Sequence, residues 1–168
     1  GFGRIGRLAF RQMFGAEGYE VVAINDLTSP KMLAHLLKYD SSQGTYEKAA
    51  TVKAGEDSIT VDGQEIKIYA FPDANNCPWG EIGVDVVLEC SGFYTSKEKA
   101  QAPINAGAKK VVISAPAGND LPTVVYNTNH TVLKPEDKII SAASCTTNCL
   151  APMADALNKY AAIQSGIM

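Results

Sequence analysis

Short apolar runs with the composition of β-strands alternate with helix-like segments along most of this 168-residue chain. Parallel strands need long crossover connections, usually helices, and their sheets are buried on both faces. Strands in such sheets therefore read as continuous apolar runs. The alternation predicts an α/β fold built on a doubly wound parallel sheet. The expected parallel strands are residues 19–26, 84–90, 110–114, 123–126 and 138–141, and the expected helices are residues 30–37, 96–106 and 150–160, after a first helix that begins near residue 5.

The pattern changes over residues 41–69, where alternating runs cover residues 46–52, 58–61 and 65–69. Alternation of apolar and polar residues is typical of strands with one solvated face. Asp62-Gly63 separates the last two runs, and Asp-Gly is a strong signal for a tight hairpin turn. The sequence therefore predicts a small antiparallel insertion.

Composition excludes several function classes. The chain is 46% hydrophobic and 20% charged, as in ordinary globular proteins, and its net charge of −3 favours neither nucleic acid nor a membrane surface. No apolar run approaches the roughly 20 residues that span a bilayer, and no signal peptide is visible. The four cysteines and two histidines lack the spacing of a metal site, so no metal is expected, and the cysteine count fits a reducing cytoplasm.

Residues 1–6 read Gly-Phe-Gly-Arg-Ile-Gly, a GxGxxG motif that opens a helix-like segment. In a dinucleotide site, Gly1 would permit a tight turn, Gly3 would let the backbone approach a pyrophosphate, and Gly6 would let the helix pack closely. The pyrophosphate would lie at the helix N-terminus, where the N–H groups are unpaired. The motif alone is weak evidence, because the strand that should precede it is absent from this sequence.

Asp26 strengthens this interpretation. It ends the next strand-like run, twenty residues after Gly6, where a carboxylate would accept a hydrogen bond from a ribose 2′-hydroxyl. The same charge would repel a 2′-phosphate, which favours NAD over NADP. The alternative is a glycine-rich turn followed by a surface aspartate.

Residues 144–149 read Ser-Cys-Thr-Thr-Asn-Cys and lie between a strand-like run and a helix-like run. Thiols at helix N-termini tend to have a lowered pKa, and the thiolate is the nucleophile. Ser144 and Thr146 could cap the helix or bind an anion beside the Cys145 sulfur. The motif indicates covalent catalysis on a carbonyl. The alternatives are a buried, inert cysteine and a redox sensor formed with Cys149, although sulfurs four residues apart on a helix are poorly placed for a disulfide.

Five segments together resemble the bacterial, phosphorylating type of the glyceraldehyde-3-phosphate dehydrogenase family, and the resemblance extends over the whole chain as the N-terminal half of such a protein. They are residues 1–7, 24–27, 36–41, 113–116 and 144–152. The resemblance implies that Cys145 attacks an aldehyde to give a thiohemiacetal. A hydride then passes to NAD, and inorganic phosphate attacks the resulting thioester to give 1,3-bisphosphoglycerate in glycolysis.

The resemblance also assigns roles to single positions. Ser144 and Thr146 match residues that help hold the attacking phosphate. Ser91 and Gly92 match a loop beside the cofactor, and Ser114 matches a residue near the nicotinamide, although serines in such places are often only turn caps. The expected NAD-binding residues are Gly1, Phe2, Gly3, Arg4, Ile5, Gly6, Asp26, Ser91, Gly92 and Ser114.

Three departures from the family pattern are visible. The resemblance implies a catalytic histidine, which would lie beyond Met168, since neither His35 nor His130 is in a matching motif. Residues 70–73 read Ala-Phe-Pro-Asp where the family often has an arginine near the adenine. Ala142 stands where many members have asparagine.

We therefore expect residues 1–144 to form an NAD-binding Rossmann domain without its first strand, and residues 145–168 to begin a truncated α+β catalytic domain. The chain reads as an internal portion of a longer protein, inactive alone, whose family implies a cytoplasmic homotetramer. Erythrose-4-phosphate dehydrogenase is the nearest alternative. A surface role in binding host proteins such as plasminogen is an alternative of another class.

Overall fold

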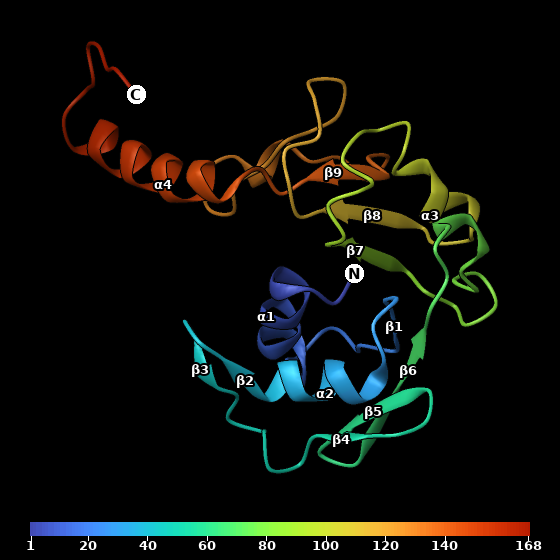
Figure 1. Ribbon diagram of the computed structural model, residues 1–168. Coiled ribbons are helices and arrows are strands. Elements are labelled where there is room, and N and C mark those ends of the chain that lie inside the picture. The colour runs from blue at the N-terminus through green and yellow to red at the C-terminus, as the bar shows by residue number, and fades with distance from the viewer.

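The computed structural model describes all 168 residues and has an α/β architecture with parallel strands, which confirms the predicted fold class (Figure 1). The strands form a four-stranded sheet of order β1-β6-β5-β4, a three-stranded sheet of order β7-β8-β9, and the two-stranded ribbon β2-β3. The elements are α1 (Arg4–Met13), β1 (Ala23–Asn25), α2 (Pro30–Lys38), β2 (Tyr39–Asp40), β3 (Gly44–Thr45), β4 (Lys53–Ala54), β5 (Ser58–Val61), β6 (Gln64–Tyr69), η1 (Ala74–Asn76), β7 (Val86–Glu89), α3 (Gln101–Asn105), β8 (Lys110–Ile113), η2 (His130–Val132), β9 (Ile139–Ser141) and α4 (Cys145–Tyr160).

The first sheet combines one parallel pair with the predicted insertion. β1 pairs in parallel with β6, while β5 pairs antiparallel with both β4 and β6. Asp62 and Gly63 join β5 to β6 with φ angles of 49° and 83°, and a type I′ hairpin turn requires positive φ at both positions. The predicted hairpin is therefore confirmed. Helices α1 and α2 cover this sheet, and its core consists of Phe2, Phe10, Ile24, Leu33, Ala34, Leu37, Tyr46, Val52, Ile59, Val61, Ile66 and Ile68.

The second sheet is parallel throughout, with Glu89 opposite Ile113 and Ile113 opposite Ser141 at its carboxyl edge. A smaller core beside α3 supports it, made of Ala100, Val111, Ile113, Ala117, Leu121 and Ile139. A third cluster around the single tryptophan, Trp79, joins the two sheets, because Ala23 and Tyr69 from one sheet and Val87 from the other pack against it. β1 and β7 do not pair with each other, so the parallel strands lie in two sheets.

Several predicted elements differ from the structure, and the predicted strand over residues 19–26 is shortened to β1. Residues 46–52 form turns, with Ala49 N–H donating to the Tyr46 carbonyl at 2.9 Å, so the predicted strand is wrong. The predicted helix over residues 96–106 is reduced to α3, because Pro103 has no N–H to continue a regular ladder. Residues 123–126 make only a parallel bridge from Thr123 to Ser141.

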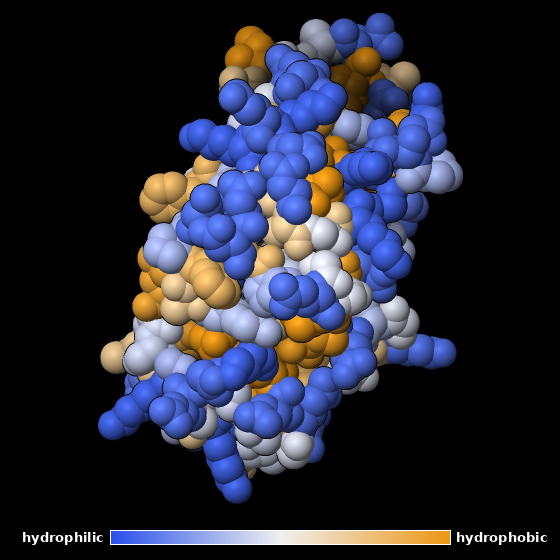
Figure 2. All heavy atoms as spheres, turned by 90° about the vertical axis from the view of Figure 1, so that its right-hand side faces the viewer, coloured by the Kyte–Doolittle hydropathy of each residue, from blue (hydrophilic) through white to orange (hydrophobic).

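Helix α4 extends away from both sheets and has no buried residue (Figure 1). Its exposed apolar side chains Leu150, Met153 and Leu157 recur at spacings of three and four, which places them on one face. Seen from the side of α3 and β6, the surface is mainly hydrophilic with small apolar patches between polar groups (Figure 2). None of the helices combines the length and the hydropathy that crossing a membrane would require.

Candidate functional site

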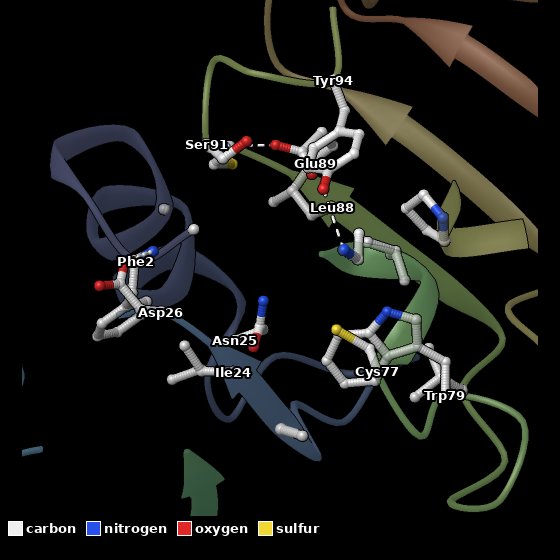
Figure 3. Close-up of a pocket in the computed structure, with 18 of the residues that line it drawn as sticks. Phe2, Ile24, Asn25, Asp26, Cys77, Trp79, Leu88, Glu89, Ser91 and Tyr94 are labelled. Carbon is white, nitrogen blue, oxygen red and sulfur yellow. Dashed lines mark hydrogen bonds between the residues drawn. The ribbon is translucent and has the colours of Figure 1, made fainter. Parts of the chain in front are cut away.

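A cavity of about 680 Å³ lies between β1 and β7 and is bounded by the start of α1 (Figure 3). Its lining is mainly apolar and includes Trp79 and Leu88. The polar groups among its walls include Asp26, Glu89 and Ser91. Among the predicted cofactor residues, Gly1, Phe2, Gly3, Gly6, Asp26 and Ser91 line this cavity, whereas Arg4, Ile5, Gly92 and Ser114 lie outside its wall.

The first turn of the chain is packed as closely as the glycine motif predicts. A Cβ on Gly1 would lie 2.7 Å from Ser91 Cα, and one on Gly6 would lie 2.3 Å from the Gly1 carbonyl oxygen. Any side chain at these two positions would therefore displace backbone. A Cβ on Gly3 would meet no atom within 4 Å, so the backbone there faces open space that a ligand can approach.

The N-terminus of α1 offers free hydrogen-bond donors. Gly3 is its N-cap and has no side chain with which to cap it, and the Arg7 N–H donates to the Gly3 carbonyl at 3.0 Å. The N–H groups of Arg4, Ile5 and Gly6 precede this bond and have no intrahelical partner. Together with the helix dipole, these donors suit a phosphate group.

Asp26 follows β1 and faces the same turn. Its Oδ2 accepts the Phe2 N–H at 2.7 Å, and its Oδ1 accepts the Thr28 N–H at 2.8 Å. Burial alone would raise the pKa of Asp26, but these two N–H donors outweigh burial and hold the pKa below its usual value. A carboxylate has about four acceptor positions, so capacity remains for ribose hydroxyls.

The loops after β7 and β8 are tied to each other at the carboxyl edge of the second sheet. The Ser114 N–H donates to the Glu89 carbonyl at 2.9 Å, and the Ser91 N–H donates to Glu89 Oε1 at 2.6 Å. Gly92 has a φ of 78°, which favours glycine. The ring of Phe93 beside it is exposed, and the Tyr94 hydroxyl accepts the Ala74 N–H at 3.0 Å (Figure 3).

Cys145 is exposed and is the first residue of α4. The helix therefore begins five residues before the predicted start at residue 150. Ser144 is the N-cap, and its Oγ accepts the Thr147 N–H at 2.9 Å. The Ser144 and Thr146 hydroxyl oxygens are 2.8 Å apart, so the two predicted anion-binding hydroxyls lie together beside the thiol. Cys149 is also exposed and forms no disulfide.

The other two cysteines lie in a different environment. Burial raises the pKa of the Cys77 thiol to about 11, and burial also raises the pKa of Cys90. Both therefore stay protonated at neutral pH and are poor nucleophiles. Exposure at a helix start leaves Cys145 as the better-placed thiol.

The turn before Cys145 is held by residues that the sequence pattern did not single out. Ala143 is buried and has a φ of 62°, a left-handed conformation that is unusual outside glycine. Its N–H donates to Ser141 Oγ, which itself donates to the Ala115 carbonyl at 2.7 Å. Asn148 Nδ2 donates to the Ala142 and Ser144 carbonyls at 2.7 Å and 2.9 Å.

Neither histidine approaches these groups as a partner. His130 Nδ1 accepts the Asn127 N–H at 3.0 Å in a surface turn, and His35 is exposed beside Tyr39. Residues 70–73 also have a local role, since Asn25 exchanges two hydrogen bonds with the Phe71 backbone. Sequence reasoning missed three residues whose side chains support the site through hydrogen bonds to backbone groups: Asn25, Glu89 and Asn148. Their only sequence signal is that each adjoins or belongs to a motif.

A close glycine turn, an uncapped helix start and a strand-end carboxylate fit the phosphates and ribose of a dinucleotide. The fold and these residues define an α/β dinucleotide-binding domain that leads into a helix with an exposed thiol at its start. The chain belongs to a family described as glyceraldehyde 3-phosphate dehydrogenase, NAD binding domain, whose model matches residues 1–97, more than half of the chain.

Proteins named glyceraldehyde-3-phosphate dehydrogenase are similar to the whole chain. That of Clostridium pasteurianum is 60% identical over 168 residues, covering 100% of this chain and 50% of the relative. That of Lactobacillus delbrueckii subsp. bulgaricus is 61% identical over 173 residues, covering 100% and 51%. That of Streptococcus pyogenes is 56% identical over 169 residues, covering 100% and 50%. The chain spans about half the length of the curated relatives it matches.

Proposed function

We propose that this chain is the cofactor-binding part of an NAD-dependent, phosphorylating glyceraldehyde-3-phosphate dehydrogenase of glycolysis. The observation that carries the proposal is the exposed Cys145 at the start of α4, with Ser144 and Thr146 beside it. Asp26, Ser91, Ser114 and Cys145 all follow parallel strands, and α/β sheets bind their ligands at the carboxyl ends of such strands.

In the proposed mechanism, Cys145 Sγ adds as a thiolate to the aldehyde carbon and forms a thiohemiacetal. When bound, NAD supplies the hydride acceptor that oxidises this adduct to a Cys145 thioester. A phosphate oxygen then attacks the thioester carbon and the carbon–sulfur bond breaks. This step regenerates the Cys145 thiolate and releases 1,3-bisphosphoglycerate. Ser144, Thr146 and the α4 N-terminus would hold the anionic phosphate during attack.

The predicted NAD contacts divide by chemistry. The N–H groups of residues 4–6 would hold the pyrophosphate, and Asp26 would accept hydrogen bonds from the adenosine ribose. The backbones of Gly1, Phe2 and Gly3 would form the close turn under the cofactor. Ser91 and Gly92, in the loop after β7, would lie along the cofactor, and Ser114, after β8, would lie near its nicotinamide.

The remaining proposals concern the whole protein. Residues 1–144 would form the NAD-binding domain and residues 145–168 the start of a catalytic domain, which agrees with the projection of α4 from the sheets (Figure 1). A cytoplasmic location and a homotetramer are proposed from family membership. Four free cysteines are compatible with that location.

The test is NADH formation from glyceraldehyde 3-phosphate by the product of the complete reading frame, with and without inorganic phosphate. We expect strong dependence on phosphate and loss of activity in Cys145→Ser. The matched control is Cys149→Ser, one helical turn later and also exposed, which should remain active.

Other outcomes identify the alternatives. Activity that is indifferent to phosphate would contradict the phosphorylating mechanism and favour erythrose-4-phosphate dehydrogenase. A folded protein without dehydrogenase activity would contradict an enzymatic role and favour a binding role, such as recognition of host plasminogen at the cell surface.

A further inference from the structure

Glu89 is a buried acidic residue to which the proposed mechanism gives no role. It ends β7, is only 6% exposed, and lies in the wall of the cavity between β1 and β7 (Figure 3). Charged side chains are seldom buried without a partner, because desolvation is costly. Its partners therefore indicate why it is there.

The carboxylate has one such partner, the backbone of a predicted cofactor residue, and the backbone of Glu89 has a second. Glu89 Oε1 accepts the Ser91 N–H at 2.6 Å, and the Glu89 carbonyl accepts the Ser114 N–H at 2.9 Å. Hydrogen bonds to a carboxylate are about twice as strong as neutral ones. The bond to Ser114 would form with any residue at position 89, so what the glutamate side chain adds is the anchor of the loop after β7.

The hydrogen bond from Ser91 to Glu89 also restricts the conformation of Gly92 and Phe93. It further fixes the position of the Ser91 backbone against the glycine turn. Ser91 Oγ accepts the Phe93 N–H at 3.1 Å, and Gly92 between them is held at a φ of 78°. On the other side, the Ser91 backbone packs against Gly1 so closely that no Cβ fits between them. The conformation of residues 91–93 therefore determines the width of the space beside the glycine turn.

We propose that Glu89 is a positioning residue for the dinucleotide, which fixes residues 91–93 against the glycine turn before the cofactor binds. The inference rests on the proposed function, since it assumes that NAD binds at this turn. Without the carboxylate, the Ser91 N–H loses its acceptor and the loop samples other conformations. Binding must then order the loop, and the apparent affinity falls by the fraction of molecules in the competent conformation.

The experiment uses the product of the complete reading frame and its variants Glu89→Leu and Glu89→Gln. We expect Glu89→Leu to raise the Kd for NAD, measured by calorimetry, by about ten- to a hundredfold, the range for a hydrogen bond to a charged group. Glu89→Gln retains an oxygen acceptor and should stay within about threefold of the parent. The KM for the aldehyde and the rate of Cys145 alkylation without NAD should not change.

Glu65→Leu is the matched control. Glu65 Oε1 also accepts a hydrogen bond of 2.6 Å, from Ser58 Oγ, but lies in the β5–β6 hairpin and outside the cavity wall. The variant should leave the Kd for NAD unchanged.

Two results would overturn the inference. One is a Glu89→Leu protein that melts earlier but binds NAD as the parent does, which would make the role purely structural. The other is an equal loss of affinity in Glu89→Gln and Glu89→Leu, since the acceptor would then be irrelevant. A parent protein that binds no NAD would instead refute the proposed function itself, and this inference with it.

Discussion

At the scale of single residues, Asp26 is tied to the glycine turn by two backbone donors. Its pKa in the folded chain lies below the usual value near 4, so its contribution to stability is fully present above that value. The contribution is lost as the pH falls through the lowered pKa. We expect Asp26→Asn to reduce the free energy of unfolding by about 1 kcal/mol at pH 7 and by much less near pH 2.

Urea unfolding of both proteins at several pH values measures this difference. Glu17→Gln is the control, because it removes an exposed carboxylate that lies away from the glycine turn. A difference between Asp26→Asn and the parent that stays constant down to pH 2 would refute the role assigned to the carboxylate charge.

Asn148 holds the turn that carries Cys145, through its bonds to the Ala142 and Ser144 carbonyls. The turn already contains the left-handed Ala143, so it depends on such external support. We expect Asn148→Ala to lower kcat about tenfold, as misplacement of a reacting group does, and to leave the Kd for NAD unchanged.

Kinetics and calorimetry on the product of the complete reading frame check this expectation. Asn158→Ala is the control on the same helix, since Asn158 Oδ1 only accepts the Ile163 N–H near the far end of α4. An equal loss of kcat in both variants would mean that the effect spreads through α4 and does not arise at the turn.

At the scale of elements, two glycines with positive φ should respond differently to alanine. A Cβ on Gly63 meets no atom within 4 Å, so only the left-handed backbone of the hairpin turn is strained. A Cβ on Gly107 would lie 2.4 Å from Gly80 Cα, which adds a clash between backbones. We expect Gly63→Ala to lower the free energy of unfolding by about 1 kcal/mol and Gly107→Ala to lower it clearly more.

Denaturant unfolding measures both losses. The control is Gly166→Ala, which should cost almost nothing because the site has open space and no positive φ. Equal losses at positions 63 and 107 would contradict the clash.

The sequence predicted those elements whose signals are local. The parallel strands and the Asp62-Gly63 turn follow from apolar runs and turn chemistry. The strand predicted over residues 46–52 is wrong because the core-facing residues there recur every three positions, not every two. Tyr46 and Val52 are buried, and Ala49 between them packs against the same core. Glu89 and Asn148 were not predictable, because their partners are backbone groups that only the folded loops bring within reach.

At the scale of the whole molecule, the site is assembled from distant parts of the chain. Asp26 follows β1, and the glycine turn packs through Phe2 on the core of the sheet that contains β1. Ser91 and Ser114 follow strands of the sheet that contains β7. These sheets meet through the cluster around Trp79 and through the contact of Gly1 with Ser91. A dinucleotide that spans the cavity would therefore connect two separately built cores.

This arrangement predicts a large and selective stabilisation by NAD. A ligand that binds only the folded state at 100 times its Kd adds about 2.7 kcal/mol to the free energy of unfolding. NADP should add much less at the same concentration, because its 2′-phosphate would meet the Asp26 carboxylate. Thermal unfolding of the product of the complete reading frame, followed by circular dichroism, measures both effects. Asp26→Gly should reduce the difference in stabilisation between NAD and NADP, because it removes the repulsion between the carboxylate and the 2′-phosphate. Equal stabilisation of the parent protein by NAD and NADP would show that Asp26 does not face the adenosine ribose and serves only to hold the Phe2 and Thr28 backbones.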